Sequence, residues 1–287
     1  MTTETAPAFK PDAIGTPGEP VEFEVERERI AAYAAATNDT IAAHASGELA
    51  PPVFSIVPSF QAMGMASMSV IPPELLGAIL HGEQDFHYHR PIEPGMKLST
   101  VSTPIGIRQR SSGVTVVVRS DTRAGDELVT EAYSTMFVRG AQGVEDAGEE
   151  APGHAFDDSL RESEPAATVT QTFDADQTFR YAEASGDPMQ IHLDEEFAKS
   201  VGLPGIIIHG LCTMAFTSVA AIESFCADDP TRLKRLAVRF SKIALPEQTI
   251  TTRLWEAGER DGRAAYAYET ESDSGDVVIK DGRAEIA

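Results

Sequence analysis

The chain has 287 residues, and at roughly 150 residues per domain this length predicts about two domains. Acidic residues outnumber basic ones by 45 to 23, so the formal net charge is −22 at pH 7. A surface of this charge repels nucleic-acid phosphates and anionic membrane headgroups, so neither is expected as a partner. The hydrophobic fraction of 42% suffices for a packed core and excludes disorder throughout the chain.

The first 20 residues, rich in Thr, Pro and Glu, predict a disordered tail. They contain no basic segment followed by an apolar one, so they do not resemble a secretory signal peptide, and we expect a cytoplasmic protein. The most apolar window, residues 203–222, carries Pro204 and His209 and predicts a buried helix rather than a membrane span. The two cysteines, Cys212 and Cys226, are expected to be buried, reduced thiols.

The chain contains an internal repeat. Residues 33–39 (YAAATND) align with residues 181–187 (YAEASGD), and a histidine follows each aspartate by five positions, at His44 and His192. Further on, residues 86–94 parallel residues 238–246. Repetition at a nearly constant offset is typical of a duplicated domain.

Each half predicts the same order of elements. A short helix comes first (residues 27–36 and 176–184), and a loop with the Asp and His leads to a longer apolar helix (residues 53–70 and 210–225). Strand-like runs separated by Gly-Asp and Asp-Gly turns follow, which indicates hairpins. One long helix followed by an antiparallel meander predicts an α+β fold in which the sheet wraps around the helix.

An acidic segment separates the halves. Between positions 142 and 176 there are ten acidic residues and one basic residue, Arg161. Such a stretch buries too little apolar surface to become ordered, so residues 141–167 are interpreted as a solvated linker. The predicted domains are therefore residues 21–140 and residues 168–287.

The chemically informative stretch begins at the end of the second short helix. Gly186-Asp187-Pro188 should end that helix and turn the chain, so Asp187 and His192 lie across one irregular loop, where they can converge. A carboxylate and an imidazole that share one water form a general acid/base pair. Gly210 opens the apolar helix, and the unpaired N–H groups at such an N-terminus can stabilise a developing oxyanion.

Each of these pieces has an ordinary structural explanation by itself, because Gly-Asp-Pro is usually a turn and lone histidines such as His192 and His209 are usually structural. The ordered combination is specific, and it resembles the MaoC-like hydratases and dehydratases of the hotdog superfamily. The matching positions are Tyr181, Ser185, Gly186, Asp187, Ile191, His192, Asp194, Gly202, Pro204, Gly205, Ile206, His209 and Gly210. With its duplicated halves the chain resembles the double-hotdog members, which include type 2 (R)-specific enoyl-CoA hydratases.

This resemblance implies a double hotdog, and a reversible hydration of a trans-2-enoyl thioester to the (R)-3-hydroxyacyl thioester. Asp187 and His192 would activate water, and the Gly210 amide would polarise the thioester carbonyl. The expected substrate-binding residues lie around this set: Pro188, Met189, Gln190, Ile208 and His209. The substrate would be a thioester of coenzyme A or of an acyl carrier protein, with no metal and no cofactor, and the chain could form a homodimer.

Two departures from the family pattern stand out. Met189-Gln190 occupies the place where many members have Asn-Pro between the Asp and the His. In the first half, residues 50–57 lack both the His and the Gly of the His-Gly loop. The N-terminal half is therefore interpreted as a degenerate hotdog that shapes the acyl tunnel, and a second active site at Asp39 and His44 is the alternative.

Several alternatives remain open at this level. The cluster of His87, His89 and Arg90 could be a metal site or simply an exposed strand face, and Arg90, Arg239 or Lys242 could contact the phosphates of coenzyme A. A helix face with Ala62, Met63, Met65 and Met68 could line the tunnel or pack in the core. For the whole chain, the alternatives are a hotdog thioesterase and a non-catalytic acyl-CoA-binding or scaffold subunit.

Overall fold

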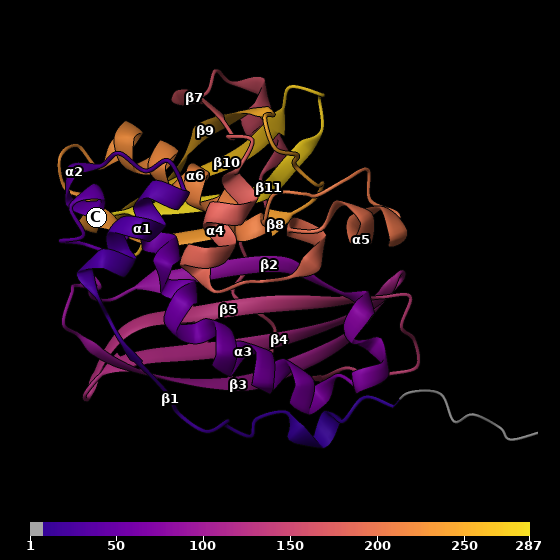
Figure 1. Ribbon diagram of the computed structural model, residues 1–287. Coiled ribbons are helices and arrows are strands. Elements are labelled where there is room, and N and C mark those ends of the chain that lie inside the picture. Colours follow the sequence, from indigo (N-terminus) through magenta and orange to yellow (C-terminus); the bar gives the residue numbers. More distant parts are fainter. Residues whose placement is uncertain (1–7) are drawn as a thin grey trace, which may run out of the picture.

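The computed structural model describes residues 8–287 as one large antiparallel sheet with helices against it (Figure 1). The sheet has eleven strands in the order β1-β3-β4-β5-β2-β8-β11-β10-β9-β7, with β6 paired to β3. The order is symmetric about the β2–β8 pair, since each half has the same five-strand arrangement. The chain is therefore a tandem duplication in which the two sheets are joined edge to edge, which confirms the predicted double hotdog.

The first half supplies the strands of one side of this junction. Its elements are β1 (Val21–Glu24), α1 (Arg27–Ala36), α2 (Ala42–Ala45), a 3-10 turn (Pro52–Ser55), α3 (Ile56–Val70), a second 3-10 turn (Pro73–Ala78), β2 (Ile79–Tyr88), β3 (Lys97–Arg110), β4 (Gly113–Ala124) and β5 (Glu127–Arg139).

The connecting segment and the second half repeat this plan with small changes. Their elements are β6 (Ala147–Gly148), a 3-10 turn (Asp158–Glu162), β7 (Ala167–Thr172), α4 (Gln177–Ser185), a 3-10 turn (Gln190–His192), α5 (Glu195–Ser200), α6 (Gly210–Phe225), a 3-10 turn (Pro230–Arg232), β8 (Leu233–Phe240), β9 (Thr249–Arg260), β10 (Arg263–Ser272) and β11 (Val277–Ile286).

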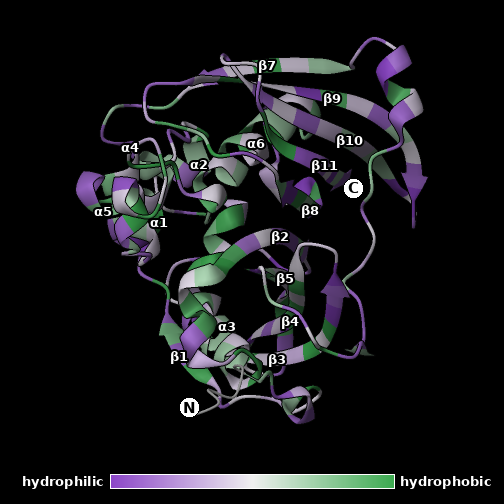
Figure 2. Ribbon diagram, turned by 90° about the vertical axis from the view of Figure 1, so that its right-hand side faces the viewer, coloured by the Kyte–Doolittle hydropathy of each residue, from purple (hydrophilic) through white to green (hydrophobic). Residues whose placement is uncertain are grey.

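The core of each half lies between its long helix and the curved sheet (Figure 2). Helix α6 buries all of its residues from Leu211 to Ile222, as the apolar window predicts. In the first half, the continuous helical stretch Pro52–Val70 is long and apolar enough to cross a membrane, but 67% of its apolar window is buried inside the molecule. That stretch is the core helix of its half, because the sheet of β1 to β5 wraps around it.

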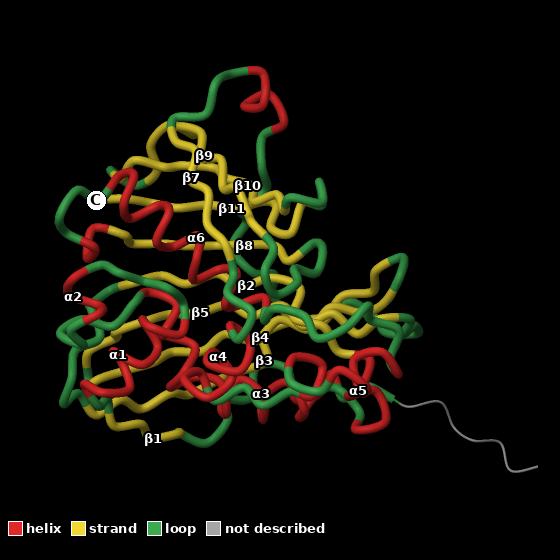
Figure 3. Tube along the Cα trace, turned by 45° about the horizontal axis from the view of Figure 1, so that its top comes forward, coloured by secondary structure: helices red, strands yellow, loops and turns green. Residues whose placement is uncertain are grey.

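The two halves are held together at two places. In the sheet, the Arg235 guanidinium of β8 donates two hydrogen bonds of 3.0 and 2.8 Å to Asp85 of β2 and one of 3.1 Å to Glu285. On the helical side, α1 packs against α4 (Figure 3), and the hydroxyls of Tyr33 and Tyr181 lie 3.3 Å apart. These tyrosines occupy equivalent positions of the repeat, so they mark its pseudo-twofold axis.

The prediction of a disordered tail at residues 1–20 is wrong for residues 8–20, and residues 1–7 lie outside the described residues. Lys10 donates its backbone N–H to Val70 O at 2.9 Å, and Gly15 donates to Pro104 O at 2.8 Å. Phe9 and Ile14 pack against the core. A few apolar anchors and backbone hydrogen bonds to existing elements are enough to order a segment of unfavourable composition.

Residues 141–167 connect the halves and are mostly exposed, as predicted for a linker, but the expectation that they lack order is wrong. Strand β6 pairs with β3, and these two segments approach so closely that a Cβ at Gly106 would lie 1.9 Å from Glu149 O. Farther along, the Trp255 Nε1–H donates to Ser163 O at 3.1 Å, and His154 Nδ1 donates to Asp281 O at 2.6 Å. Acidic composition does not show such individual anchors, which is why the sequence suggests solvation.

Candidate active site

Asp187 is positioned by the end of helix α4. Gly186 adopts the left-handed conformation with φ of 80°, which ends the helix and turns the chain as expected. The Ser185 hydroxyl accepts the Asp187 N–H at 3.3 Å, and Asp187 Oδ1 accepts the Met189 N–H at 3.2 Å. The carboxylate is therefore held by its own loop.

His192 is oriented by a backbone carbonyl. Its Nδ1 lies 2.8 Å from Ile207 O. A carbonyl only accepts, so Nδ1 carries the proton and Nε2 is left as the unprotonated nitrogen of the neutral ring. Burial lowers the pKa of His192 and raises the pKa of Asp187, and both shifts favour the uncharged forms.

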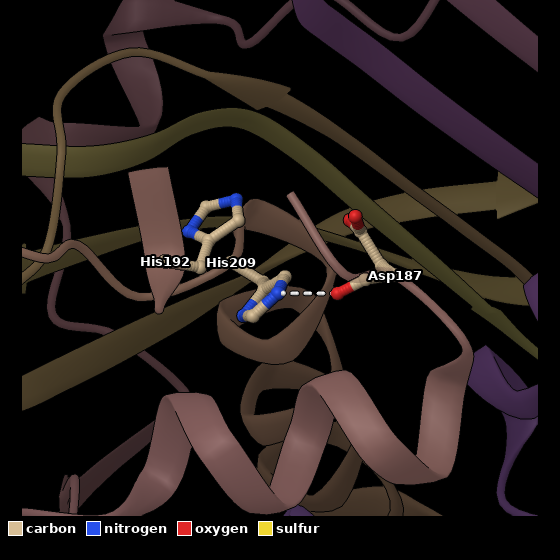
Figure 4. A group of neighbouring side chains, drawn as sticks. All are labelled: Asp187, His192 and His209. Atoms are coloured by element: carbon tan, nitrogen blue, oxygen red, sulfur yellow. Dashed lines mark hydrogen bonds between the residues drawn. The ribbon is translucent and has the colours of Figure 1, made fainter. Parts of the chain in front are cut away.

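Asp187, His192 and His209 converge, and their ligand-type atoms all lie within 4.8 Å of one another (Figure 4). In the described structure the Asp187 carboxylate makes no direct hydrogen bond to either ring. Within the group, His209 Nε2 donates a hydrogen bond of 3.3 Å to the Asp187 backbone oxygen. The carboxylate and the His192 ring are thus near neighbours that are held apart, which is the arrangement a shared water requires.

His209 packs against His192 of this pair. Its ring stacks on that of His192 with centroids 3.6 Å apart and lies 4.9 Å from the ring of Tyr181. Burial lowers the pKa of His209 to about 2, and proximity to His192 adds to this, so the ring stays neutral. The sequence pattern includes Tyr181 without a role, and the structure shows it packing against His209.

Gly210 is the first residue of α6, and its N–H belongs to the unpaired donors of a helix N-terminus. The preceding Ile208 donates its own N–H to Ala244 O at 2.8 Å, which fixes the approach to the helix. A Cβ at Gly210 would lie 3.0 Å from the Phe240 ring, and Phe240 packs edge-to-face on His81 of the first half. Sequence reasoning did not find Ile207, Phe240 or His81, because their contribution depends on long-range packing or on a backbone atom.

The group of Asp187, His192 and His209 meets the distance requirement for a metal site, which the sequence spacing does not suggest. The two rings, however, are stacked with an interplanar angle of 23°. Imidazole binds metals in the ring plane through a nitrogen lone pair. An ion between two stacked rings would lie out of both planes, so the geometry does not fit a shared metal ion.

The remaining predicted substrate-binding residues fall into two groups. Ile208 and His209 are buried beside the acid/base pair, whereas Pro188, Met189 and Gln190 are exposed on the loop that leads to His192. Within residues 8–287 the Gln190 side chain makes no hydrogen bond to Asp187 or His192. It therefore does not replace the Asn of the family pattern as a partner of these two groups.

The corresponding region of the first half is built differently. The Ala50 N–H donates to Ile92 O at 2.9 Å, just as the Ile208 N–H donates to Ala244 O. This match places Pro51 and Pro52 at the positions of His209 and Gly210. Proline has no N–H, so this helix start lacks the donor that Gly210 supplies. We therefore assign no active site to Asp39 and His44.

The other sequence candidates are spread over the molecule. His87 Nε2 lies 3.3 Å from Asp85 Oδ2, while His89 is exposed, so the two do not form a metal cluster in the described structure. Arg239 lies within 4.0 Å of Glu83 and Asp281, and Lys242 is exposed next to the segment that holds Ile208. On α3, Ala62 and Met63 are buried, and Met65 and Met68 are exposed.

Two family models match the chain, one in each half. Residues 158–277 match the MaoC like domain, and residues 12–132 match the FAS1-like, dehydratase domain region. The chain is 30% identical to the 3-hydroxyacyl-thioester dehydratase Y of Mycobacterium tuberculosis over 97% of its own length and 98% of the relative. The chain belongs to the MaoC-like dehydratase family.

Other members of the MaoC-like family agree with this assignment. The mouse peroxisomal multifunctional enzyme type 2 is 28% identical over 79% of the chain, and the match spans 30% of that longer relative. A solved MaoC-like dehydratase from Phytophthora capsici superposes with a TM-score of 0.84 and 25% identity, covering 96% of this chain and 97% of the other. A Mycobacterium tuberculosis structure described as a double hotdog gives 0.62 at 12% identity, which supports the fold alone.

Proposed function

We propose that the protein catalyses the reversible hydration of a trans-2-enoyl thioester to the (R)-3-hydroxyacyl thioester, or the dehydration in reverse. The observation that carries the proposal is the convergence of Asp187 and His192 at the N-terminus of α6, close together but not bonded to each other. Family membership supports the same reaction class, since relatives are named 3-hydroxyacyl-thioester dehydratase and enoyl-CoA hydratase 2.

In this mechanism the water supplies the hydroxyl at C3, and its remaining proton replaces the one that Asp187 delivers to C2. The unprotonated His192 Nε2 accepts a proton from the water as the water oxygen bonds to C3. The electrons of the C2=C3 bond move into the thioester, and the resulting enolate takes a proton at C2 from the Asp187 carboxyl. Transfer of the proton on His192 to Asp187 restores the starting state. Both groups act from one side of the substrate, so the addition is syn.

The N-terminus of α6 has a separate role in the proposal. The enolate carries negative charge on the thioester oxygen, and the Gly210 N–H would donate to that oxygen, aided by the helix dipole. Because Gly210 has no side chain, the thioester can approach the backbone next to the Phe240 ring. The raised pKa of Asp187 and the lowered pKa of His192 both favour the acid and base forms that the mechanism uses.

The test is hydration of crotonyl-CoA and longer enoyl-CoAs, followed by loss of the enoyl thioester absorbance and by chiral analysis of the product. Asp187→Asn and His192→Ala should each lower kcat by about 10²–10⁴-fold while the circular dichroism spectrum stays unchanged. Wild-type rates in either variant would refute the mechanism. Release of free thiol would indicate a thioesterase, and tight binding without turnover would indicate a scaffold subunit.

The partners that this function implies are part of the proposal. The substrate would be an acyl thioester of coenzyme A or of an acyl carrier protein, and a chain-length series from crotonyl- to dodecenoyl-CoA would define the acyl group. Lys242, an exposed cation near the α6 N-terminus, is our choice for contact with the coenzyme A phosphates. A homodimer of double hotdogs, a cytoplasmic location and independence from cofactors stay predictions.

A further inference from the structure

A cleft lies at the end of the β2–β8 pair away from the Asp187–His192 site, where the pseudo-symmetry would place the missing site of the first half. Its cavity has a volume of about 40 Å³. The residues that matter for its chemistry come from both halves of the chain: His44, Ser55, Tyr88, Arg90, Thr231 and Lys234. This cleft is separate from the Asp187–His192 site and has no part in the proposed reaction.

The wall of the cleft contains polar groups that the protein itself leaves unsatisfied. His44 is fully buried, and Asp39 Oδ2 occupies its Nδ1 at 2.7 Å, so Nε2 is the nitrogen that remains available. That Nε2 has no hydrogen-bond partner in the described structure, and the buried hydroxyl of Tyr88 has none either. Because Asp39 accepts the proton on His44 Nδ1, Nε2 of the neutral ring is an acceptor, whereas the Tyr88 hydroxyl can also donate. Buried polar atoms are normally paired, so the Tyr88 hydroxyl is a candidate donor to a ligand in this cleft.

The charge of the cleft is opposite to that of the rest of the molecule. Its lining holds two cations, Arg90 and Lys234, and no carboxylate, although the whole chain has 45 acidic residues and a net charge of −22. Arg90 pairs with Glu127, whose side chain is 68% exposed and can be displaced at little cost. Within residues 8–287, Lys234 has no carboxylate within 4.0 Å.

We propose that this cleft binds a small oxyanion, the carboxylate or phosphate group of a ligand, between Arg90 and Lys234, with the Tyr88 hydroxyl as a donor at its buried side. The cavity of about 40 Å³ exceeds the ~10–15 Å³ that a single water needs, so it has room for one small group with the rest of the ligand outside. The site binds without catalysing, because Pro51 and Pro52 remove the helix donor that an oxyanion intermediate needs.

The test is isothermal titration of the full-length protein with sodium acetate and, separately, with sodium phosphate at constant ionic strength. One of the two should bind saturably with a stoichiometry of one, and the better ligand identifies the group as carboxylate or phosphate. Lys234→Ala and Arg90→Ala should each weaken that binding about tenfold, the effect of one lost charge-assisted hydrogen bond. The matched control is Lys97→Ala, which removes an exposed cation on β3 and should leave binding unchanged.

Three results would overturn the proposal: no saturable binding of either anion, binding that both cleft variants leave intact, and binding that Lys97→Ala weakens as much as they do. The last would show a response to overall charge instead of a site. None of these measurements uses the hydration reaction, so they are independent of the proposed enzymatic function.

Discussion

The two halves of the molecule carry the same aspartate–histidine pair in two different arrangements. In the first half His44 Nδ1 and Asp39 Oδ2 are 2.7 Å apart and buried, so the two groups satisfy each other. In the second half a backbone carbonyl holds His192 Nδ1, and the Asp187 carboxylate is bound to its own loop. A pair that is bonded together stabilises the fold, whereas a pair held apart by other partners remains available for a water and a substrate.

Among the tests of this comparison, we expect the largest effect from the start of the long helix, where Gly210 in the second half corresponds to Pro52 in the first. Gly210→Pro copies the first half's Pro52 and should lower kcat by about 10²–10³-fold, because it removes one oxyanion donor. The helix itself tolerates proline at its first position, and His209, with φ −59° and ψ 134°, already has the backbone conformation that a following proline requires. Enoyl-CoA hydration rates measure the effect.

Gly210→Ala is the matched control for that substitution. It brings the same Cβ within about 3.0 Å of the Phe240 ring but keeps the N–H. If Gly210→Ala lost as much activity as Gly210→Pro, the close packing against Phe240 would be the cause, and the N–H would have no special role.

Removing the aspartate of each half should have opposite consequences. Asp39→Ala leaves the buried His44 without its partner, so it should lower the free energy of unfolding by about 3 kcal/mol and leave kcat/KM essentially unchanged. Urea denaturation and hydration assays on the same samples measure both. An Asp39→Ala protein that stayed fully stable but lost turnover would show that the first half contains the active site.

The pH dependence of stability should reveal His209, whose equivalent position in the first half is Pro51. The folded-state pKa of His209 is lowered to about 2 from 6.5, so below pH 6.5 the unfolded chain takes up a proton that the folded chain does not. Stability should therefore fall with decreasing pH, by up to about 1.4 kcal/mol per pH unit for this group. His209→Phe should reduce the slope of unfolding free energy against pH by about that amount.

His81 serves as the comparison for that experiment. Burial lowers its pKa to about 4, so His81→Phe should reduce the slope only between pH 6.5 and 4, while the effect of His209→Phe should continue below pH 4. An unchanged slope in His209→Phe would mean that this ring is protonated in the folded protein.

The smallest effect on the free energy of unfolding is expected from Tyr33 and Tyr181, which lie at the pseudo-twofold axis between the halves. The Tyr33 and Tyr181 hydroxyls share one long hydrogen bond of 3.3 Å, so Tyr181→Phe should cost about 0.5–1 kcal/mol of unfolding free energy. Adding Tyr33→Phe should cost less than a second such loss, because the bond is already gone. Additive losses in denaturation experiments would show that the two hydroxyls are not coupled.

Much of this architecture is readable in the sequence. The helices at residues 27–36 and 210–225 are found with the predicted limits, and the Asp261-Gly262 hairpin has the positive φ values, 49° and 76°, of its turn type. Strand β3 gives no clear strand signal, because it contains Pro104 and Gly106, and the structure accommodates them in a register shift. The order of the tail and of the acidic segment was not predicted, because composition averages over the few residues that anchor them.

The sequence by itself determined the duplication, the fold class and the residues that we propose as acid, base and oxyanion donor, because these depend on residue type and spacing. Only the tertiary structure decided which aspartate–histidine pair is not bonded to itself. His192 is held by the Ile207 carbonyl, and the start of α6 is fixed by the Ile208 N–H bond to Ala244, and both contacts join distant segments. The excess of acidic residues argues against polyanionic partners, and that expectation stays a prediction. The one cleft lined by Arg90 and Lys234 without a carboxylate emerged only when the fold brought β2 and β8 together.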